Sequence, residues 1–195
     1  MISKDREYRS FGFEPVEDEA MIIEGVPIVF EQRTLMYEHD GLKFYEQIDK
    51  EALRNALVDD VVLNIDHVGK PAAKTKNGTL ELEVRDGDVF MKADLSKNAT
   101  GRELYEDIKN GFYDKMSFAF TVTDQEYDSE TRTRTIKKID RLYDVSAVTV
   151  PAYSQTTLMA RSFFTAEAEK EVAEAMELEK EKLKLEIRTK TEGVN

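Results

Sequence analysis

Residues 100–122 read TGRELYEDIKNGFYDKMSFAFTV, and this stretch predicts how the folded part of the chain is organised. Thr100 and Glu103 have the spacing of a capping box, in which a hydroxyl and a carboxylate satisfy the exposed amides at a helix start. Apolar residues then recur every four positions, as on one face of a helix. They are Leu104, Ile108 and Phe112. Ser117 follows this helix and opens a predicted strand that runs to Val122.

Residues 80–95 predict a β-hairpin that precedes the helix. Apolar and polar residues alternate along two segments, as in strands that bury one face. The apolar positions are Leu80, Leu82 and Val84 in the first segment and Val89, Met91, Ala93 and Leu95 in the second. Asp86 and Gly87 separate the segments. This pair is typical of a type I′ turn, in which both central residues have positive φ.

Short strands dominate the rest of the folded region. We expect strands at Met21–Phe30, Phe44–Ile48, Val61–Ile65, Thr133–Lys138 and Leu142–Val150. Pro27 makes the first of these an edge strand or a bulged strand, and Pro151 ends the last. A short helix is expected over Lys50–Val58, with Asp49 as its N-cap. The predicted fold class is therefore α+β, most simply a mainly antiparallel β-barrel with flanking helices.

The character of the chain changes after Phe164. The next 26 residues, TAEAEKEVAEAMELEKEKLKLEIRTK, contain no Gly or Pro and predict a helix. Its first half is acidic and its second half is basic, as the helix dipole favours. A narrow apolar stripe consists of Val172, Met176, Leu183 and Ile187. Two interpretations stay open, a solvated helical tail or a partner-binding or coiled-coil segment. We divide the chain into an N-terminal arm (1–20), a domain (21–162) and a charged helical tail (163–195).

The composition argues against several classes of function. The 195 residues include 28 basic and 40 acidic side chains, which give a formal net charge of −12 and disfavour nucleic acid as a partner. No apolar run approaches the roughly 18 residues of a membrane span, so we expect an intracellular protein without a membrane segment. The chain has no cysteine and two histidines, so neither a thiolate zinc site nor a multi-histidine metal site is expected. We expect no cofactor.

Three residues are candidates for catalytic chemistry. A serine becomes a nucleophile when a base, usually histidine, takes its proton. His39 lies in a polar turn and is expected at the surface, whereas His67 follows a predicted strand and leads into a loop. Ser117 is also compatible with a small residue in a tightly packed strand. Asp144 has apolar neighbours and needs a partner if it is buried, either an arginine or the Nδ1–H of His67.

The order of these segments resembles the tailed-phage prohead maturation protease family, which is related to herpesvirus assemblin. Six segments within residues 20–160 carry the resemblance. They read IIEGVPIVFE, FYEQIDKEAL, VVLNIDHVGKPAAKT, GTLELEVRDGDVFMKADL, GRELYEDIKNGFYDKMSFAF and LYDVSAVTVPAYSQT. Two places depart from the family pattern. Asp66 precedes the histidine where the family often has Asn-His-Asp, and Phe118-Ala119 follow the serine where a glycine is common nearby.

The resemblance implies a serine endopeptidase with a herpesvirus-protease-like fold. Ser117 would be the nucleophile, His67 the general base and Asp144 the third member of the triad, with no metal or organic cofactor. The implied substrates are the scaffolding protein or the scaffolding domain of the major capsid protein precursor, and the protease itself. Cleavage would occur inside the procapsid in the host bacterial cytoplasm, and a homodimer is conceivable. The tail would contact scaffold or capsid. The alternative is a catalytically inactive scaffold or assembly protein with the same barrel.

Overall fold

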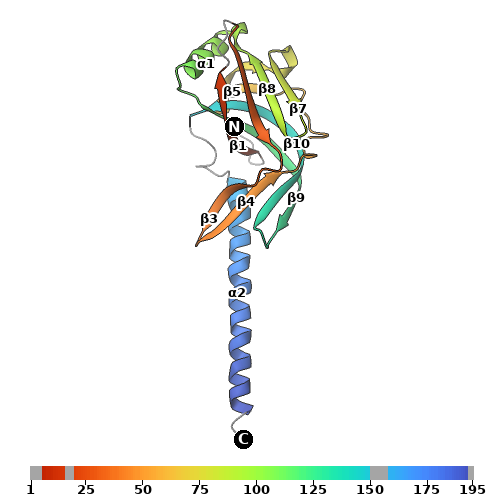
Figure 1. Cartoon of the computed structure of the whole chain (residues 1–195), viewed down its shortest axis with the longest axis vertical. Helices are drawn as coiled ribbons and strands as arrows, with labels where there is room; N and C mark the ends of the chain where they lie inside the picture. The colour runs from red at the N-terminus through yellow and green to blue at the C-terminus, as the bar shows by residue number, and fades with distance from the viewer. Residues whose placement is uncertain (1–5, 16–19, 150–157, 193–195) are drawn as a thin grey trace.

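The computed structural model consists of a body of strands from which one long helix projects (Figure 1). It describes residues 6–15, 20–149 and 158–192. Within these ranges strands outnumber helices, so the predicted α+β class is confirmed.

The strands in chain order are β1 (Glu7–Pro15), β2 (Ile22–Val29), β3 (Thr34–His39), β4 (Leu42–Ile48), β5 (Val62–Ile65), β6 (Val68–Lys74), β7 (Leu80–Val84), β8 (Asp88–Asp94), β9 (Lys115–Asp128) and β10 (Thr133–Val148). The α-helices are α1 (Ala99–Lys109) and α2 (Leu158–Glu192), and two 3₁₀ turns are η1 (Thr75–Asn77) and η2 (Leu95–Lys97). The register of β2 shifts between Gly25 and Ile28, so the bulge predicted at Pro27 is confirmed.

The ladders form two open sheets instead of the predicted closed barrel. The hydrogen-bonded path runs β3-β4-β10-β9-β1-β2-β8-β7, and the β5–β6 pair branches from β10. Strand β1 joins the two sheets, because one part of it pairs with β9 and another with β2. The path ends at β3 and β7, which do not pair with each other in the described part of the chain. Segment 7–15, which we expected within an N-terminal arm, therefore lies inside the strand order.

Strand β10 organises the larger sheet. It pairs antiparallel with β9 along one edge, and parallel with β4 and then β5 along the other. The two strands predicted at Thr133–Lys138 and Leu142–Val150 are one continuous strand, because register shifts absorb the residues between them. The predicted end at Val150 and Pro151 lies outside the described residues.

Helix α1 begins two residues earlier than a capping box at Thr100 would require. Its N-cap is Asn98, whose side chain accepts a hydrogen bond from the backbone N–H of Gly101 (2.8 Å). The predicted capping box is therefore wrong. Gly101 packs so closely that an added Cβ would lie 2.4 Å from the Leu95 carbonyl oxygen, which fixes the helix start against η2. Phe112 lies beyond the helix and is 70% exposed.

The helix predicted over Lys50–Val58 is wrong, because this segment forms successive turns. Asp49 does accept a hydrogen bond from the backbone N–H of Glu51 (2.8 Å), as a cap would. The backbone of Leu57, however, bonds to β10 through the Asp140 carbonyl (2.8 Å) and the Leu142 N–H (3.1 Å). The sheet thus takes the backbone groups that a helix would need.

The β7–β8 hairpin is confirmed, although its turn type is not. Asp86 and Gly87 form the turn, and the Arg85 N–H bonds to the Asp88 carbonyl (2.8 Å). Neither turn residue has positive φ, so the type I′ prediction is wrong. The Gly87 carbonyl accepts a hydrogen bond from the backbone N–H of Phe30 (2.9 Å), which ties this turn to the end of β2.

Helix α2 starts on the larger sheet and then leaves it (Figure 1). Phe164 and Ala168 are buried in a small apolar cluster with Met36 and Phe44 of the β3–β4 hairpin. From Val172 onward the apolar side chains are exposed. Residues 172–192 therefore project by roughly 30 Å, at about 1.5 Å per residue.

Four charged side chains are buried close to this docking point. Arg9 bonds to Glu7 and Glu46, and Arg134 bonds to the same two carboxylates, with distances between 2.5 and 2.9 Å. Burial alone would raise the pKa of Glu7, but hydrogen bonds from Arg134 and the charges of both arginines lower it to about 2. The network joins β1, β4 and β10, and Arg134 also lies 5.2 Å from the ring centre of Phe163 in α2.

Candidate active site

His67 lies in the two-residue turn between β5 and β6. Ile65 and Val68 pair across this hairpin, and Asp66 and His67 have φ values of 46° and 62°. This is the left-handed geometry of a type I′ turn, which Gly and Asn occupy most readily and which strains a histidine. The Asp66 carboxylate accepts a hydrogen bond from the backbone N–H of Thr149 (3.2 Å). The turn is thereby tied to the end of β10.

A bulge in β10 turns Asp144 away from the main core. Leu142 pairs with Phe120, and both belong to the main apolar cluster, whereas Asp144 pairs with Ala119, which does not. In a regular strand Asp144 would share a face with Leu142, because residues two apart point to the same side. The register shift between them places the carboxylate on the opposite, buried face of the sheet.

On that face Asp144 contacts His67. The His67 Nδ1 and Asp144 Oδ1 atoms are 2.5 Å apart, and the two side chains are 13% and 5% exposed. The hydroxyl of Ser146 donates to the same carboxylate oxygen at 2.8 Å. A carboxylate in this position orients an imidazole and keeps its Nδ1 protonated, so that Nε2 is the basic nitrogen.

Tyr8 of β1 packs against the imidazole from another strand. The rings of Tyr8 and His67 meet edge to face, with centroids 4.5 Å apart. Burial raises the pKa of the Tyr8 hydroxyl, and the negative charge of Asp144 raises it further. Our sequence analysis missed both Tyr8 and Ser146. Ser146 had a signal, its position two residues after Asp144, but Tyr8 had none because β1 pairs with a strand far along the chain.

Ser117 lies beside this pair without being bonded to it. It is opposite Ser146 in the β9–β10 ladder, two residues along from the Asp144–Ala119 pair. Ser117 is 1% exposed, and its hydroxyl makes no hydrogen bond to any described group. The structure thus brings His67 and Asp144 together and places Ser117 on the neighbouring strand. Serine–histidine hydrogen bonds of this kind often tighten only when substrate is bound.

Among the described residues, other candidate features would be the second histidine, a metal cluster or a membrane helix. His39 is 46% exposed at the end of β3, next to Asp40. Across the described ranges there is no group of three His, Asp or Glu side chains that suits a metal ion. None of the described helices combines the length and the apolar character that a membrane crossing needs.

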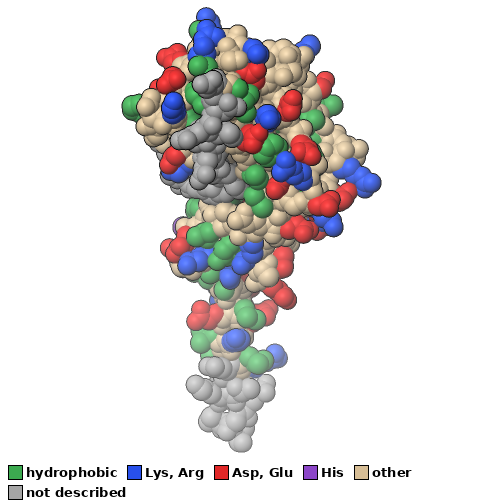
Figure 2. Space-filling view, turned by 45° about the horizontal axis from the view of Figure 1, so that its top comes forward, with side chains coloured by type: hydrophobic (Ala, Val, Ile, Leu, Met, Phe, Trp, Pro, Cys, Tyr) green, Lys and Arg blue, Asp and Glu red, His purple; other side chains and the backbone are tan. Residues whose placement is uncertain are grey.

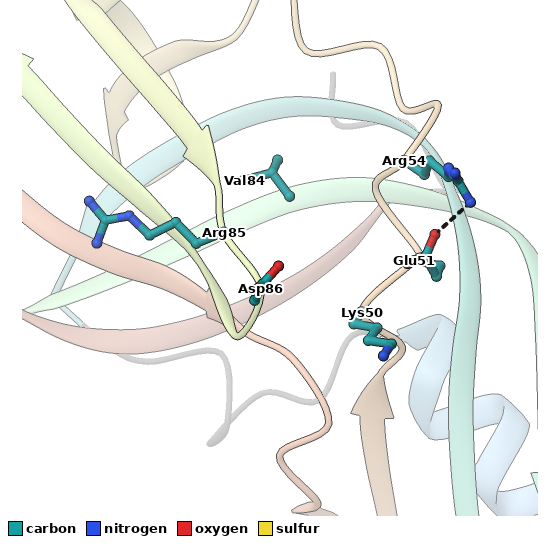
Figure 3. Close-up of a pocket in the computed structure, with 6 residues that line it drawn as sticks. All are labelled: Lys50, Glu51, Arg54, Val84, Arg85 and Asp86. Carbon is teal, nitrogen blue, oxygen red and sulfur yellow. Dashed lines mark hydrogen bonds and ion pairs between the residues drawn. The ribbon is translucent and has the colours of Figure 1, made fainter.

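A surface pocket of ≈ 560 Å³ lies between the turns after β4 and the β7–β8 hairpin (Figure 3). Its lining consists of Lys50, Glu51, Arg54, Val84, Arg85 and Asp86. Glu51 and Arg54 form an ion pair of 3.0 Å across one side of it. The pocket shares no residue with the His67–Asp144 site.

Comparison with known proteins agrees with the resemblance seen in the sequence. The profile of the Caudovirus prohead serine protease family matches residues 7–171. Among curated protein sequences none matches. Among solved structures, the capsid assembly protease gp21 of bacteriophage T4 is similar, with a TM-score of 0.51 and 14% identity over 75% of this chain and 98% of that chain. That likeness shows the fold alone. The family profile, by contrast, covers most of the chain, from β1 to the docked part of α2. The chain therefore belongs to the Caudovirus prohead serine protease family, whose members are peptidases of phage capsid assembly.

Proposed function

We propose that the chain is a prohead maturation endopeptidase that cleaves the scaffolding protein, or the scaffolding domain of the major capsid protein precursor, and also itself. It would act inside the procapsid in the host bacterial cytoplasm. The observation that best supports a serine-protease mechanism is the 2.5 Å contact between His67 and Asp144, because it couples the histidine to a buried carboxylate. The choice of substrates rests on the family and on the assembly role of the similar T4 protease.

In the proposed reaction, Ser117 Oγ attacks the carbonyl carbon of the scissile peptide bond while His67 Nε2 takes the hydroxyl proton. The C–N bond then breaks, and His67 returns the proton to the leaving amine. Water hydrolyses the resulting ester of Ser117, with His67 again acting as the base. Asp144 stabilises the imidazolium that forms in both halves, and no metal or organic cofactor takes part.

The buried position of Ser117 sets a requirement for this reaction. Ser117 is 1% exposed and its buried hydroxyl bonds to no described group, so substrate entry has to open this face of the sheet. The same step has to bring Ser117 Oγ within hydrogen-bond distance of His67 Nε2. Backbone N–H groups beside Ser117 are our candidates for holding the oxyanion.

Cleavage assays with matched variants test this proposal. Wild-type protein, Ser117→Ala and His67→Ala are each incubated alone and with the capsid precursor or the scaffolding protein, and intact masses are followed over time. Ser129→Ala, in the exposed β9–β10 turn, and His39→Ala serve as controls for the two substitutions. We expect cleavage by the wild type and both controls, and none by the two site variants.

Two results would contradict the proposal. If the wild type leaves every substrate and itself uncut, the inactive assembly protein is the better description. If Ser117→Ala cleaves as the wild type does, the nucleophile is another residue.

We also propose that the protease domain begins earlier than expected from the sequence. The expected boundaries were an arm at 1–20, a domain at 21–162 and a tail at 163–195. Strand β1 begins at Glu7 and pairs first with β9 and then with β2. Phe164 and Ala168 are buried against the β3–β4 hairpin. The domain would then run from Glu7 to the docked start of α2, and the interaction segment would begin at Val172.

A further inference from the structure

The projecting part of α2 exposes a row of apolar side chains. Val172, Met176, Leu183 and Ile187 are 42%, 60%, 59% and 57% exposed. At 3.6 residues per turn all four lie on one side of the helix. Val172 and Leu183 are eleven residues apart, as are Met176 and Ile187, and an 11-residue repeat keeps a nearly straight helix facing one partner. Apolar side chains alternate with charged ones along the projecting helix (Figure 2). Contiguous exposed apolar surface is typical of protein-binding sites.

The charges on the same helix are separated along its length. Residues 166–179 contain six acidic side chains and one basic side chain, whereas residues 180–192 contain five basic and three acidic side chains. The boundary between the two halves falls at 179–180, which is also the midpoint of the apolar row. The row and the charges therefore share one centre.

We propose that this segment of α2 pairs antiparallel with α2 of a second copy of the chain, about a twofold axis near residues 179–180. Positions whose numbers sum to 359 then lie opposite each other. Val172 meets Ile187 of the second copy, and Met176 meets Leu183. The acidic half of each helix faces the basic half of the other, whereas parallel pairing would place two acidic halves side by side.

Charges beside the apolar row support the antiparallel direction. Glu179 and Lys182 lie on the same flank of the row, on either side of its midpoint. In an antiparallel pair the same flanks of the two helices adjoin, so Glu179 lies beside Lys182 of the second copy, twice by symmetry. On the other flank Glu177 bonds to Lys180 within its own helix at 3.2 Å.

A second pair of exposed leucines provides a matched control. Leu178 and Leu185 are 54% and 66% exposed and lie on the side of the helix away from the four-residue row. This second set has only two residues, compared with four in the row, and its midpoint does not coincide with the charge boundary at 179–180. An acidic substitution at Leu178 therefore changes the helix as much as one at Leu183 without touching the proposed interface.

The first experiment measures the oligomeric state. The full chain with Ser117→Ala, which prevents self-cleavage, is examined by sedimentation over a range of concentrations. We expect a monomer–dimer equilibrium that Leu183→Asp weakens by at least about tenfold and that Leu178→Asp changes less than about twofold. A monomer at every concentration overturns the proposal, and so does a dimer to which Leu183→Asp makes no greater difference than Leu178→Asp. A tail that binds only capsid or scaffolding protein gives the first of these results.

The second experiment measures the direction. Because the chain has no cysteine, Met176→Cys and Leu183→Cys each introduce a single thiol. A mixture of the two should oxidise to the mixed disulfide, identified by mass, ahead of either symmetric one. A preference for the symmetric Met176→Cys dimer would show parallel pairing and overturn the proposal.

The third experiment swaps the proposed ion pair. Glu179→Lys and Lys182→Glu should each weaken the dimer, and the double substitution should restore it, while Glu181→Lys on the far side should leave it unchanged. Failure of the double substitution to restore pairing would contradict the antiparallel register. None of these measurements depends on peptidase activity, so the dimer and the proposed function can fail separately.

Discussion

Leu142 and Asp144 face opposite sides of the sheet, although only Tyr143 separates them in β10. The register shift at this point pairs Leu142 with Phe120 in the main core and Asp144 with Ala119 on the other face. In a regular strand the carboxylate would enter the apolar core without a partner, which is strongly unfavourable. The bulge instead brings it to His67. Bulges beside functional sites commonly re-aim a side chain in this way.

Replacing Asp144 by Asn tests the role of this carboxylate. Asn is nearly the same size but removes the charge that stabilises the imidazolium and permits the wrong histidine tautomer. We expect kcat to fall by about 10³–10⁴-fold. Initial rates on the capsid precursor, with Ser117→Ala as the zero reference, provide the measurement. Full activity in Asp144→Asn would show that the third member of the triad lies elsewhere.

Ser146→Ala should lower kcat by roughly three- to tenfold, with KM nearly unchanged. The hydroxyl donates to the Asp144 carboxylate at 2.8 Å and is fully buried, so its loss removes one of the two groups that hold that carboxylate. Ser146 would thus be a positioning residue. Steady-state kinetics separate kcat from KM, and Ser129→Ala is the control. An unchanged kcat would show that the His67 contact alone is sufficient.

The positive φ of Asp66, in the turn that carries His67, predicts which substitutions this position tolerates. Asn adopts positive φ readily and retains an oxygen that can accept from the Thr149 N–H, so Asp66→Asn should fold and cleave normally. Asp66→Val forces a β-branched residue into the left-handed region. We expect the free energy of unfolding to fall by about 1–2 kcal/mol, with a loss of activity. Urea unfolding of the two variants provides the measurement, and equal stabilities would contradict the strain argument.

The buried network at Glu7 predicts acid sensitivity. The pKa of Glu7 is lowered from 4.5 to about 2 in the folded chain, so the unfolded chain binds this proton more readily. The resulting stabilisation is complete above pH 4.5 and is lost as the pH falls from 4.5 toward 2. The shift corresponds to about 3 kcal/mol. Chemical unfolding at several pH values in this range measures it.

Glu7→Gln should flatten that part of the pH profile. At neutral pH it should also lower the free energy of unfolding by roughly 3–5 kcal/mol, because the buried charges of Arg9 and Arg134 lose a counter-charge. Glu38→Gln, at an exposed position of β3, is the control and should leave the profile unchanged. If Glu7→Gln follows the wild-type curve, another carboxylate determines the acid transition.

Local patterns were sufficient to predict much of the sheet. Alternation and turn residues indicated the β7–β8 hairpin, whose two strands are neighbours along the chain. The same reasoning could not place β1. Glu7 and Arg9 look like solvated residues, and they are buried only because Glu46 and Arg134, far along the chain, compensate them. Leu57 likewise does not form the predicted helix, because it makes a β-bridge with Arg141, which is far along the chain.

The candidate site was predictable to a similar extent. His67 was the better placed of two histidines, and a contact with Asp144 was one of two interpretations of that carboxylate. The structure shows this contact, while the catalytic roles of His67, Asp144 and Ser117 stay predictions. The bulge at Tyr143 had no signature in the alternation of residues. Nor did any local pattern show that Ser117 would be buried without a hydrogen bond.

Strand β10 extends between two distant parts of the molecule. Arg134 near its start is fixed in the buried ion network beside Phe163 of α2, and Asp144 near its end holds His67. Asp144 lies ten positions after Arg134 (144 − 134), a separation of roughly 33 Å in a regular extended strand. Strand β9 pairs along one edge of this segment, with several register shifts. Along the other edge β4 pairs with residues 133–136 and β5 with residues 144–147. The docked part of α2 and the His67 site therefore contact opposite ends of the same strand.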